Sequence, residues 1–380
     1  MKIRSKLPDV GVTIFTVMSK LAADHGAHNL SQGFPDFDVS PDLVSLVEHY
    51  MHSGHNQYAP MQGVPVLCER IAEKIRMLYG AEVDPQSQIT VTSGATEALF
   101  AAISAVVGPG DEVIILEPAY DSYAPVVALN GGRPVFRQMK YPDYRIDWDE
   151  VGESVTDKTT LLILNSPHNP TGKILSGDDV AALKEIVQRN GLFILSDEVY
   201  EHIIFDGAGH RSMLRDPELA ARSFVVSSFG KTYHTTGWKI GYCVAPPALT
   251  DEFRKIHQFL TFATNTPTQL AYAEFLQKQE VYLQLPAFYQ KKRDMFLDLI
   301  RPSRFKPLAC QGTYFQMLDY SDISDQPDMA FAEWMTVEKK VAAIPPSVFY
   351  NNRDDHKVLR FCFAKKDDTL KNAASILCKI

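Results

Sequence analysis

The residue in this sequence whose type and position most directly suggest chemistry is a lysine at the end of an apolar run. Lys231 lies in the polar turn of residues 228–232 (SFGKT), directly after the apolar run 223–227. A lysine held at the ligand-binding edge of a sheet can form an imine with a carbonyl compound. Most lysines at strand ends are simply solvated, so Lys231 alone is weak evidence. The GKT triplet also resembles the end of a phosphate-binding loop, but Val225 stands where that loop requires glycine.

Polar turns after neighbouring apolar runs carry Asp197, Tyr200 and Asn169. Taken singly, an aspartate in this place is more often a helix N-cap, and the Asn-Pro-Thr-Gly that begins at Asn169 is a turn signal. Together with Lys231 they supply what a pyridoxal ring needs. Asp197 would keep the ring nitrogen protonated, and Tyr200 and Asn169 would donate to the ring oxygen. Tyr120, shortly after the apolar run 112–116, could stack on the face of the pyridoxal ring, although ordinary packing of a half-buried tyrosine is nearly as good an interpretation.

A small-residue turn into a helix offers a place for a phosphate group. The backbone N–H groups of Gly94, Ala95 and Thr96 would face an anion at the start of this predicted helix, and the helix dipole adds to the attraction. Ser93 or Thr96 could instead be a plain N-cap. Lys239, eight residues after Lys231, could add a point charge to the phosphate.

The elements that must position these side chains follow from alternating short apolar runs and helix-like stretches from Ile89 onward. Seven candidate strands cover residues 89–92, 112–116, 133–138, 160–164, 192–196, 223–227 and 240–245. This pattern predicts an α/β fold with a mostly parallel seven-stranded sheet between helices, whose ligands bind at the carboxyl ends of the strands. Before residue 48 we expect loops and one short helix. We expect a large domain over residues 48–285 and a smaller α+β domain built from residues 1–47 and 286–380.

Composition excludes several classes of protein. The net charge of −8 argues against nucleic acid as the main partner. The five cysteines form no CxxC pair, which favours reduced thiols in a cytoplasmic protein over disulfides or a metal site. Residues 1–6 are basic, as at the start of an export signal, but Pro8 and Gly11 interrupt the apolar segment that would have to follow, so we expect no export. The sequence has no apolar run long enough to predict a membrane span.

At this point the sequence resembles the class I and II aminotransferases of pyridoxal-phosphate fold type I, over its whole length. It is most similar to the methionine aminotransferases and the kynurenine/glutamine aminotransferases. The stretches that carry the resemblance are residues 29–37 (NLSQGFPDF), 56–58 (NQY), 196–200 (SDEVY), 230–232 (GKT) and 344–345 (IP). The resemblance implies pyridoxal 5'-phosphate as cofactor, bound to Lys231, and amino acids and 2-oxo acids as substrates.

The resemblance assigns the residues already named to the same roles and adds further ones. Ser228 and Tyr58 would contact the phosphate, with Tyr58 reaching the site of a neighbouring subunit, which implies a homodimer with shared active sites. Arg360 would grip the substrate α-carboxylate, which the backbone of Gly33 would also approach. Phe15 would line the substrate pocket, although a core role fits it about equally well. The family more often has arginine in place of Lys239.

Several functions remain open at this stage. A cysteine-S-conjugate β-lyase or a kynurenine aminotransferase would use the same site. A transcriptional regulator built on an aminotransferase-like domain would need an added DNA-binding segment, and a nicotinamide-dependent dehydrogenase would need a GxGxxG motif after a strand, which this sequence lacks. We expect methionine to be the best amino donor and aspartate a poor one, because residues 258–265 (QFLTFATN), expected near the substrate side chain, contain two phenylalanines and no arginine.

Overall fold

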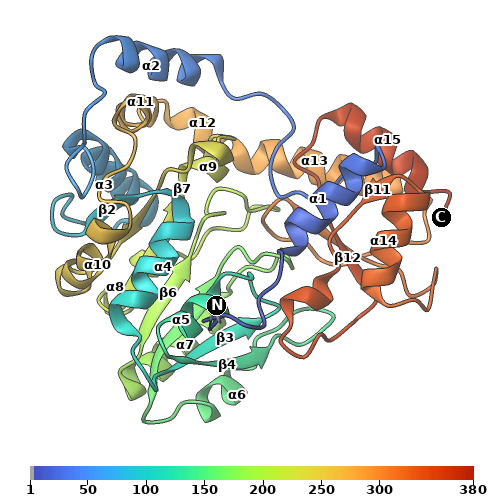
Figure 1. The fold of residues 1–380 in the computed structure, drawn as a ribbon, viewed down its shortest axis with the longest axis horizontal. Coiled ribbons are helices and arrows are strands. Elements are labelled where there is room, and N and C mark those ends of the chain that lie inside the picture. The colour runs from blue at the N-terminus through green and yellow to red at the C-terminus, as the bar shows by residue number, and fades with distance from the viewer. Residues whose placement is uncertain (1–3) are drawn as a thin grey trace.

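Seven strands form one mixed sheet in the computed structural model, which describes residues 4–380 (Figure 1). Residues 1–3 of the basic start lie outside the described part. The strand order is β2-β8-β7-β6-β5-β3-β4, and all pairs are parallel except those of β8 with β2 and β7. The strands are β2 (Ile89–Thr92), β3 (Glu112–Glu117), β4 (Arg133–Gln138), β5 (Thr159–Asn165), β6 (Phe193–Asp197), β7 (Ser223–Ser228) and β8 (Gly241–Val244). The expected mostly parallel sheet is confirmed.

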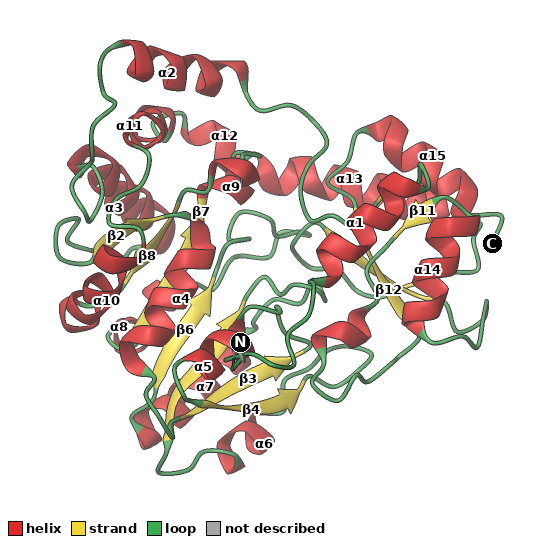
Figure 2. Ribbon diagram, in the orientation of Figure 1, coloured by secondary structure: helices red, strands yellow, loops and turns green. Residues whose placement is uncertain are grey.

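Helices cover both faces of this sheet, as Figure 2 shows. Alternate residues of each strand point to opposite faces. Val113 and Ile115 of β3 pack in one apolar cluster with the residues of α4, α5 and α10, whereas Ile114 and Leu116 pack in another with residues of α3, α7 and α8. The helices are α3 (Pro65–Tyr79), α4 (Gly94–Val106), α5 (Tyr123–Leu129), α6 (Trp148–Glu153), α7 (Gly177–Asn190), α8 (Pro217–Ala220), α9 (Phe229–Thr232) and α10 (Pro247–Leu260).

A segment near the N-terminus packs with the C-terminal part of the chain: α1 (Ile14–Asp24) lies against α14 (Asp328–Glu338) and β11 (Val341–Ala342), as Figure 1 shows. Strand β1 (His28–Asn29) pairs in parallel with β11 (Val341–Ala342), and β10 (Phe315–Asp319) pairs antiparallel with β9 (Lys306–Pro307) and β12 (Val358–Cys362). Helices α13 (Leu285–Ile300), α14 (Asp328–Glu338) and α15 (Asp367–Leu377) belong to this part of the molecule, whereas α11 (Thr266–Phe275) packs against α3 and is followed by α12 (Gln279–Leu283). The domain boundaries at 47/48 and 285/286 stay a prediction.

The expectation of a single short helix before residue 48 is wrong. Two helices occur there, α1 (Ile14–Asp24) and α2 (Pro41–His52). Thr13 caps α1, since its side chain accepts the N–H of Thr16. Pro41 marks the start of α2, because proline fits the first turn of a helix, where its missing N–H costs nothing.

Within residues 4–380, no helix is both long enough and apolar enough to span a bilayer.

Candidate active site

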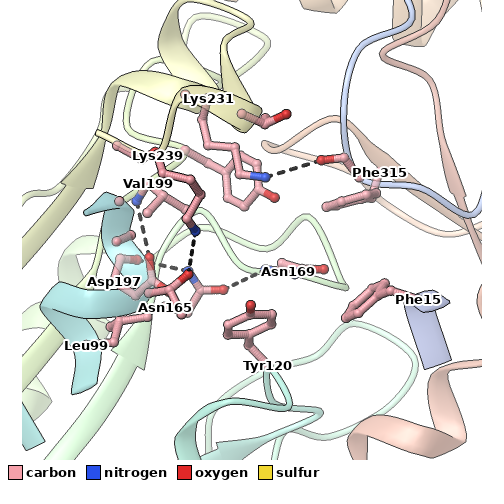
Figure 3. Close-up of a pocket in the computed structure, with 18 of the residues that line it drawn as sticks. Phe15, Leu99, Tyr120, Asn165, Asn169, Asp197, Val199, Lys231, Lys239 and Phe315 are labelled. Carbon is pink, nitrogen blue, oxygen red and sulfur yellow. Dashed lines mark hydrogen bonds between the residues drawn. The ribbon is translucent and has the colours of Figure 1, made fainter. Parts of the chain in front are cut away.

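A cavity of about 240 Å³ opens at the carboxyl ends of β5, β6 and β7. Figure 3 shows the side chains of Lys231, Asp197, Tyr120 and Phe15 around it. The sequence-predicted residues that line the cavity are Phe15, Gly33, Gly94, Ala95, Thr96, Tyr120, Asn169, Asp197, Tyr200, Ser228, Lys231, Lys239 and Arg360. Segments far apart in the sequence therefore meet at one place, as the topology of a parallel sheet requires.

Lys231 enters the cavity from α9, one turn after β7 ends. Its Nζ donates to the carbonyl oxygen of Gly33 at 3.2 Å and to the hydroxyl of Tyr314 at 2.9 Å. Desolvation by burial is the largest cause that lowers the pKa of Lys231, to about 8. About a tenth of this amine is therefore neutral at pH 7, far more than for an ordinary lysine, and the neutral form is the one that acts as nucleophile or proton acceptor.

Asp197 ends β6 and is buried. Its carboxylate accepts the hydroxyl of Tyr123 at 2.7 Å and the N–H of Val199 at 3.3 Å. Burial raises the pKa of Asp197 to about 6, while these two hydrogen bonds act in the opposite direction. A buried carboxyl group of this kind is stabilised as a carboxylate by any cation placed against it.

The turn before α4 has the features of an anion site. Gly94 takes a positive φ of 69° and begins the helix, and the side chain of Ser93 makes no capping hydrogen bond. Lys239 Nζ reaches across from the turn before β8 and donates to Thr96 Oγ1 at 3.0 Å. The backbones approach closely, because a Cβ on Gly241 would stand 2.9 Å from the Ala95 nitrogen. Lys239 has no ion pair within residues 4–380.

Arg360 lies on β12 with none of its surface exposed. It donates to Asn169 Oδ1 at 2.7 Å and to the carbonyl oxygen of Ser31 at 3.0 Å, and its Nε has no partner among the described residues. Its guanidinium lies 3.9 Å from the ring centre of Phe315 and 5.4 Å from that of Phe15. Burial lowers the pKa of Arg360 to about 10. In the described chain it pairs with no carboxylate, so a substrate carboxylate would satisfy it.

Asn169 connects the two halves of the site. Its side-chain oxygen accepts from Arg360, while its backbone N–H donates to Asn165 Oδ1 at 2.8 Å. Asn165 in turn donates to the carbonyl oxygen of Asp197 at 2.9 Å. Because the Asn169 oxygen is engaged by Arg360, its NH₂ group remains as a donor toward the cavity.

The segment 197–201 has two faces. Asp197 and Tyr200 line the cavity, whereas Glu198 and Glu201 enter a buried polar cluster. Glu198 contacts His210 Nε2 at 2.7 Å, and Glu201 accepts from Lys74 Nζ at 2.7 Å. The cavity-facing pair is thus fixed from the opposite side by the Lys74–Glu201 ion pair and the Glu198–His210 hydrogen bond, which the sequence did not predict.

Tyr58 does not reach the cavity of its own chain. Its side chain is 84% exposed and packs edge-on against Phe262, with ring centres 5.6 Å apart. The expectation that it enters the site of a second subunit stays a prediction.

The sequence analysis did not identify four residues with direct contacts in the site: Tyr123, Asn165, Tyr314 and Phe315. Tyr123 and Asn165 lie close in sequence to residues that were found, Tyr120 and Asn169, and a search of the same turns would include them. Tyr314 comes directly before β10, which belongs to the three-stranded sheet β12-β10-β9, and nothing in the sequence around it predicts a role in the site.

The comparisons with known proteins agree with this geometry. The sequence profile described as aminotransferase class I and II matches residues 26–377. The chain belongs to the class I and II aminotransferases. A methionine aminotransferase of Escherichia coli K12 is 52% identical over 98% of this chain and 97% of its own length. A kynurenine–oxoglutarate transaminase of Dictyostelium discoideum is 34% identical over 97% of this aminotransferase and 94% of the relative.

The fold matches as closely as the sequence. The crystal structure of an Escherichia coli protein identified as a methionine aminotransferase superposes with a TM-score of 0.98 at 51% identity, covering all of both chains. The fold of this aminotransferase is therefore fold type I, as expected from the resemblance.

Proposed function

We propose that this aminotransferase uses pyridoxal 5'-phosphate to move the amino group of methionine, and of aromatic and other long uncharged amino acids, to a 2-oxo acid. The observation that carries the proposal is the single cavity that holds Lys231, Asp197 and Arg360. Each presents a group that a different part of the cofactor–substrate pair would satisfy: an amine for an aldehyde, a carboxylate for a ring nitrogen and a guanidinium for a carboxylate.

The residues present fit the cofactor. The helix start at Gly94–Thr96, the hydroxyl of Ser228 and the cation of Lys239 form a cradle for a phosphate dianion. A side chain at Gly94 would fill this cradle, since its Cβ would stand 3.2 Å from Lys239 Nζ. The buried carboxyl group of Asp197 lies in the same cavity, where a protonated pyridine nitrogen would hold it ionised.

When bound, pyridoxal phosphate supplies an aldehyde for amine exchange and a protonated ring that withdraws electrons from the substrate Cα. Asp197 would hold the proton on the ring nitrogen. Burial raises the pKa of Tyr200 well above its usual range, so its hydroxyl stays protonated and would donate, with Asn169, to the ring oxygen. Arg360 orients the substrate by its α-carboxylate, and Lys231 Nζ carries the α-proton.

Two observations support the substrate preference. Phe15 and Phe315 line the cavity beside Arg360, and such aromatic walls suit a thioether or an aromatic side chain better than a second carboxylate. The methionine aminotransferase of Escherichia coli shares half of the sequence. The kynurenine–oxoglutarate relative keeps kynurenine as a second candidate donor.

A series of amino donors with one fixed 2-oxo acid acceptor tests this preference. We expect methionine to lead and aspartate to be at least about a hundredfold poorer in kcat/KM, because an unpaired carboxylate would be buried. Scoring ammonia and pyruvate separately detects β-lyase activity on cysteine S-conjugates. Aspartate matching methionine would refute the preference.

Covalent trapping tests the cofactor assignment. Borohydride treatment of the purified protein should fix the cofactor irreversibly to Lys231, and peptide mapping would identify the residue. Lys231→Ala should keep the fold and lose both the trapped product and amino transfer. A modification at another lysine would contradict the assignment.

A homodimer with shared active sites is also part of the proposal. Tyr58 and its neighbours Phe259, Leu260 and Phe262 are exposed apolar side chains, with Phe259 at 87% exposure. Such a cluster is typical of a surface that a second chain covers. Light scattering would measure the mass of the protein at the concentration used in the activity assay. A fully active monomer would refute the proposal of shared active sites.

We place the protein in the cytoplasm. All five cysteines are free thiols, which supports a reducing compartment.

A further inference from the structure

Tyr314 contacts the reactive amine directly. The residue is fully buried just before β10, and its hydroxyl oxygen lies 2.9 Å from Lys231 Nζ. The same hydroxyl donates its own proton to the carbonyl oxygen of Gly33, at 2.6 Å. Lys231 Nζ also donates to that carbonyl, at 3.2 Å. The three groups therefore form a closed triangle at one end of the lysine side chain.

The direction of each hydrogen bond follows from chemistry. A carbonyl oxygen can only accept, so the Tyr314 proton is committed to Gly33 and the tyrosine oxygen accepts from Lys231. Burial raises the pKa of Tyr314 well above its usual range, so the hydroxyl keeps its proton. Lys231 thus faces two acceptors, the Tyr314 oxygen and the Gly33 oxygen.

We propose that Tyr314 is a positioning residue for Lys231: its hydroxyl and the Gly33 carbonyl accept the two N–H hydrogens of the neutral amine and leave the nitrogen lone pair facing the cavity. The inference rests on the proposed function. A neutral amine has two N–H bonds and one lone pair, so two acceptors fix the direction of the third tetrahedral position.

As a consequence, Lys231 Nζ can accept and donate the transferred proton in only one direction, the direction of its lone pair. The lone pair takes the α-proton of the substrate, and the electron pair of the broken C–H bond stays on the substrate side, where the bound cofactor withdraws it. The ammonium would then deliver a proton from the same position to the carbon that the cofactor's aldehyde supplies, so that the amino group can leave with the cofactor. Tyr314 neither gains nor loses a proton in this exchange.

The surroundings of Tyr314 keep its hydroxyl in place. Its ring packs edge-on against Tyr200 at 5.1 Å and lies 5.7 Å from the ring of Tyr289. The other titratable groups that act on the charge of Lys231 are Cys362, Arg360, Asp197 and Lys239. Tyr200 completes the set, because Lys231 Nζ lies 5.5 Å from its ring centre.

Tyr289 provides a matched control. It is also fully buried in this aromatic cluster, but its hydroxyl has no partner within residues 4–380. Tyr314→Phe and Tyr289→Phe remove the same atom from neighbouring rings. Because Gly33 and Lys231 already contact each other, Tyr314→Phe leaves neither group unpaired, and both variants should melt close to the wild type.

The first measurement is the pH dependence of covalent capture of pyridoxal phosphate by the cofactor-free full chain, followed by its absorbance. Only the neutral amine attacks the aldehyde, so the wild-type rate should rise with pH and level off above the Lys231 pKa of about 8. An acceptor favours the ammonium form, so Tyr314→Phe should shift this profile down by about one pH unit. Tyr289→Phe should keep the wild-type profile.

The second measurement is the amino-donor half-reaction of the holoenzyme with methionine and α-deuterated methionine. Loss of the fixed lone-pair direction should slow proton transfer by about tenfold to a hundredfold and enlarge the isotope effect in Tyr314→Phe alone. If Tyr314→Phe and Tyr289→Phe gave the same pH profile and isotope effect, the inference would be overturned. A wild-type chain that fails to capture the cofactor at Lys231 would instead overturn the proposed function.

Discussion

Replacing Arg360 by lysine keeps the positive charge but removes the fork of donors. Arginine has five N–H donors, of which one contacts Asn169 and one contacts Ser31, so three remain for a carboxylate that takes two. Lysine has three donors, and the same two contacts leave one. One charge-assisted hydrogen bond is worth about 1.5–3 kcal/mol, so kcat/KM for methionine should fall by about tenfold to a hundredfold.

The assay compares the two enzymes on paired substrates. Steady-state kcat/KM is measured for methionine and for 3-(methylthio)propylamine, which lacks the α-carboxylate, with one 2-oxo acid acceptor. The amine should react slowly with both enzymes and at similar rates, because the lost hydrogen bond has no partner on it. Cofactor content and melting temperature are measured in parallel, since Arg360 is fully buried and its substitution could alter packing.

Two results would refute this reasoning. An unchanged kcat/KM for methionine would remove Arg360 from the substrate site. An equal loss on methionine and on the amine would mean that Arg360 acts through the architecture of the cavity, without binding the carboxylate.

Three further substitutions probe other parts of the site. Asp197→Asn should lower kcat by about a hundredfold or more, because the ring nitrogen loses its buried counter-ion, and single-turnover kinetics at full cofactor occupancy would measure this; a kcat near that of the wild type would contradict the role. Tyr58→Phe should weaken cofactor binding by about tenfold through one lost hydrogen bond to phosphate, read as the dissociation constant of the cofactor; equal affinity would place Tyr58 outside the partner's site. In Gly33→Ala the new Cβ would stand 2.8 Å from the ring of Phe315, so the KM for methionine should rise by about tenfold, and an unchanged KM would show that Phe315 yields freely.

The large sheet could be predicted from sequence because each strand is a short apolar run bounded by turn residues. Strands β2 and β4 have the expected bounds, and β7 extends one residue further, to Ser228. The second N-terminal helix was missed because Pro41 is also a turn signal. Only its position directly before a helix-forming stretch distinguishes the two uses of proline.

The candidate site was predictable where a residue follows a strand of the parallel sheet, since strand ends of one sheet converge. Asp197, Asn169 and Lys231 are of this kind. Arg360 was placed by resemblance and Tyr314 was missed, because Arg360 lies on β12 and Tyr314 directly before β10, in the three-stranded sheet β12-β10-β9. Only tertiary packing brings that sheet to the cavity, and no local spacing encodes it.

The two-faced segment 197–201 has a consequence for mutational tolerance. Glu201 binds Lys74, a residue 127 positions earlier in the chain, and neither side chain touches the cavity. Randomised libraries should therefore tolerate change at the aromatic wall residues Phe15 and Phe315 far better than at Lys74 or Glu201. Engineering this enzyme to accept new amino donors should therefore vary Phe15 and Phe315 and keep Lys74 and Glu201 unchanged.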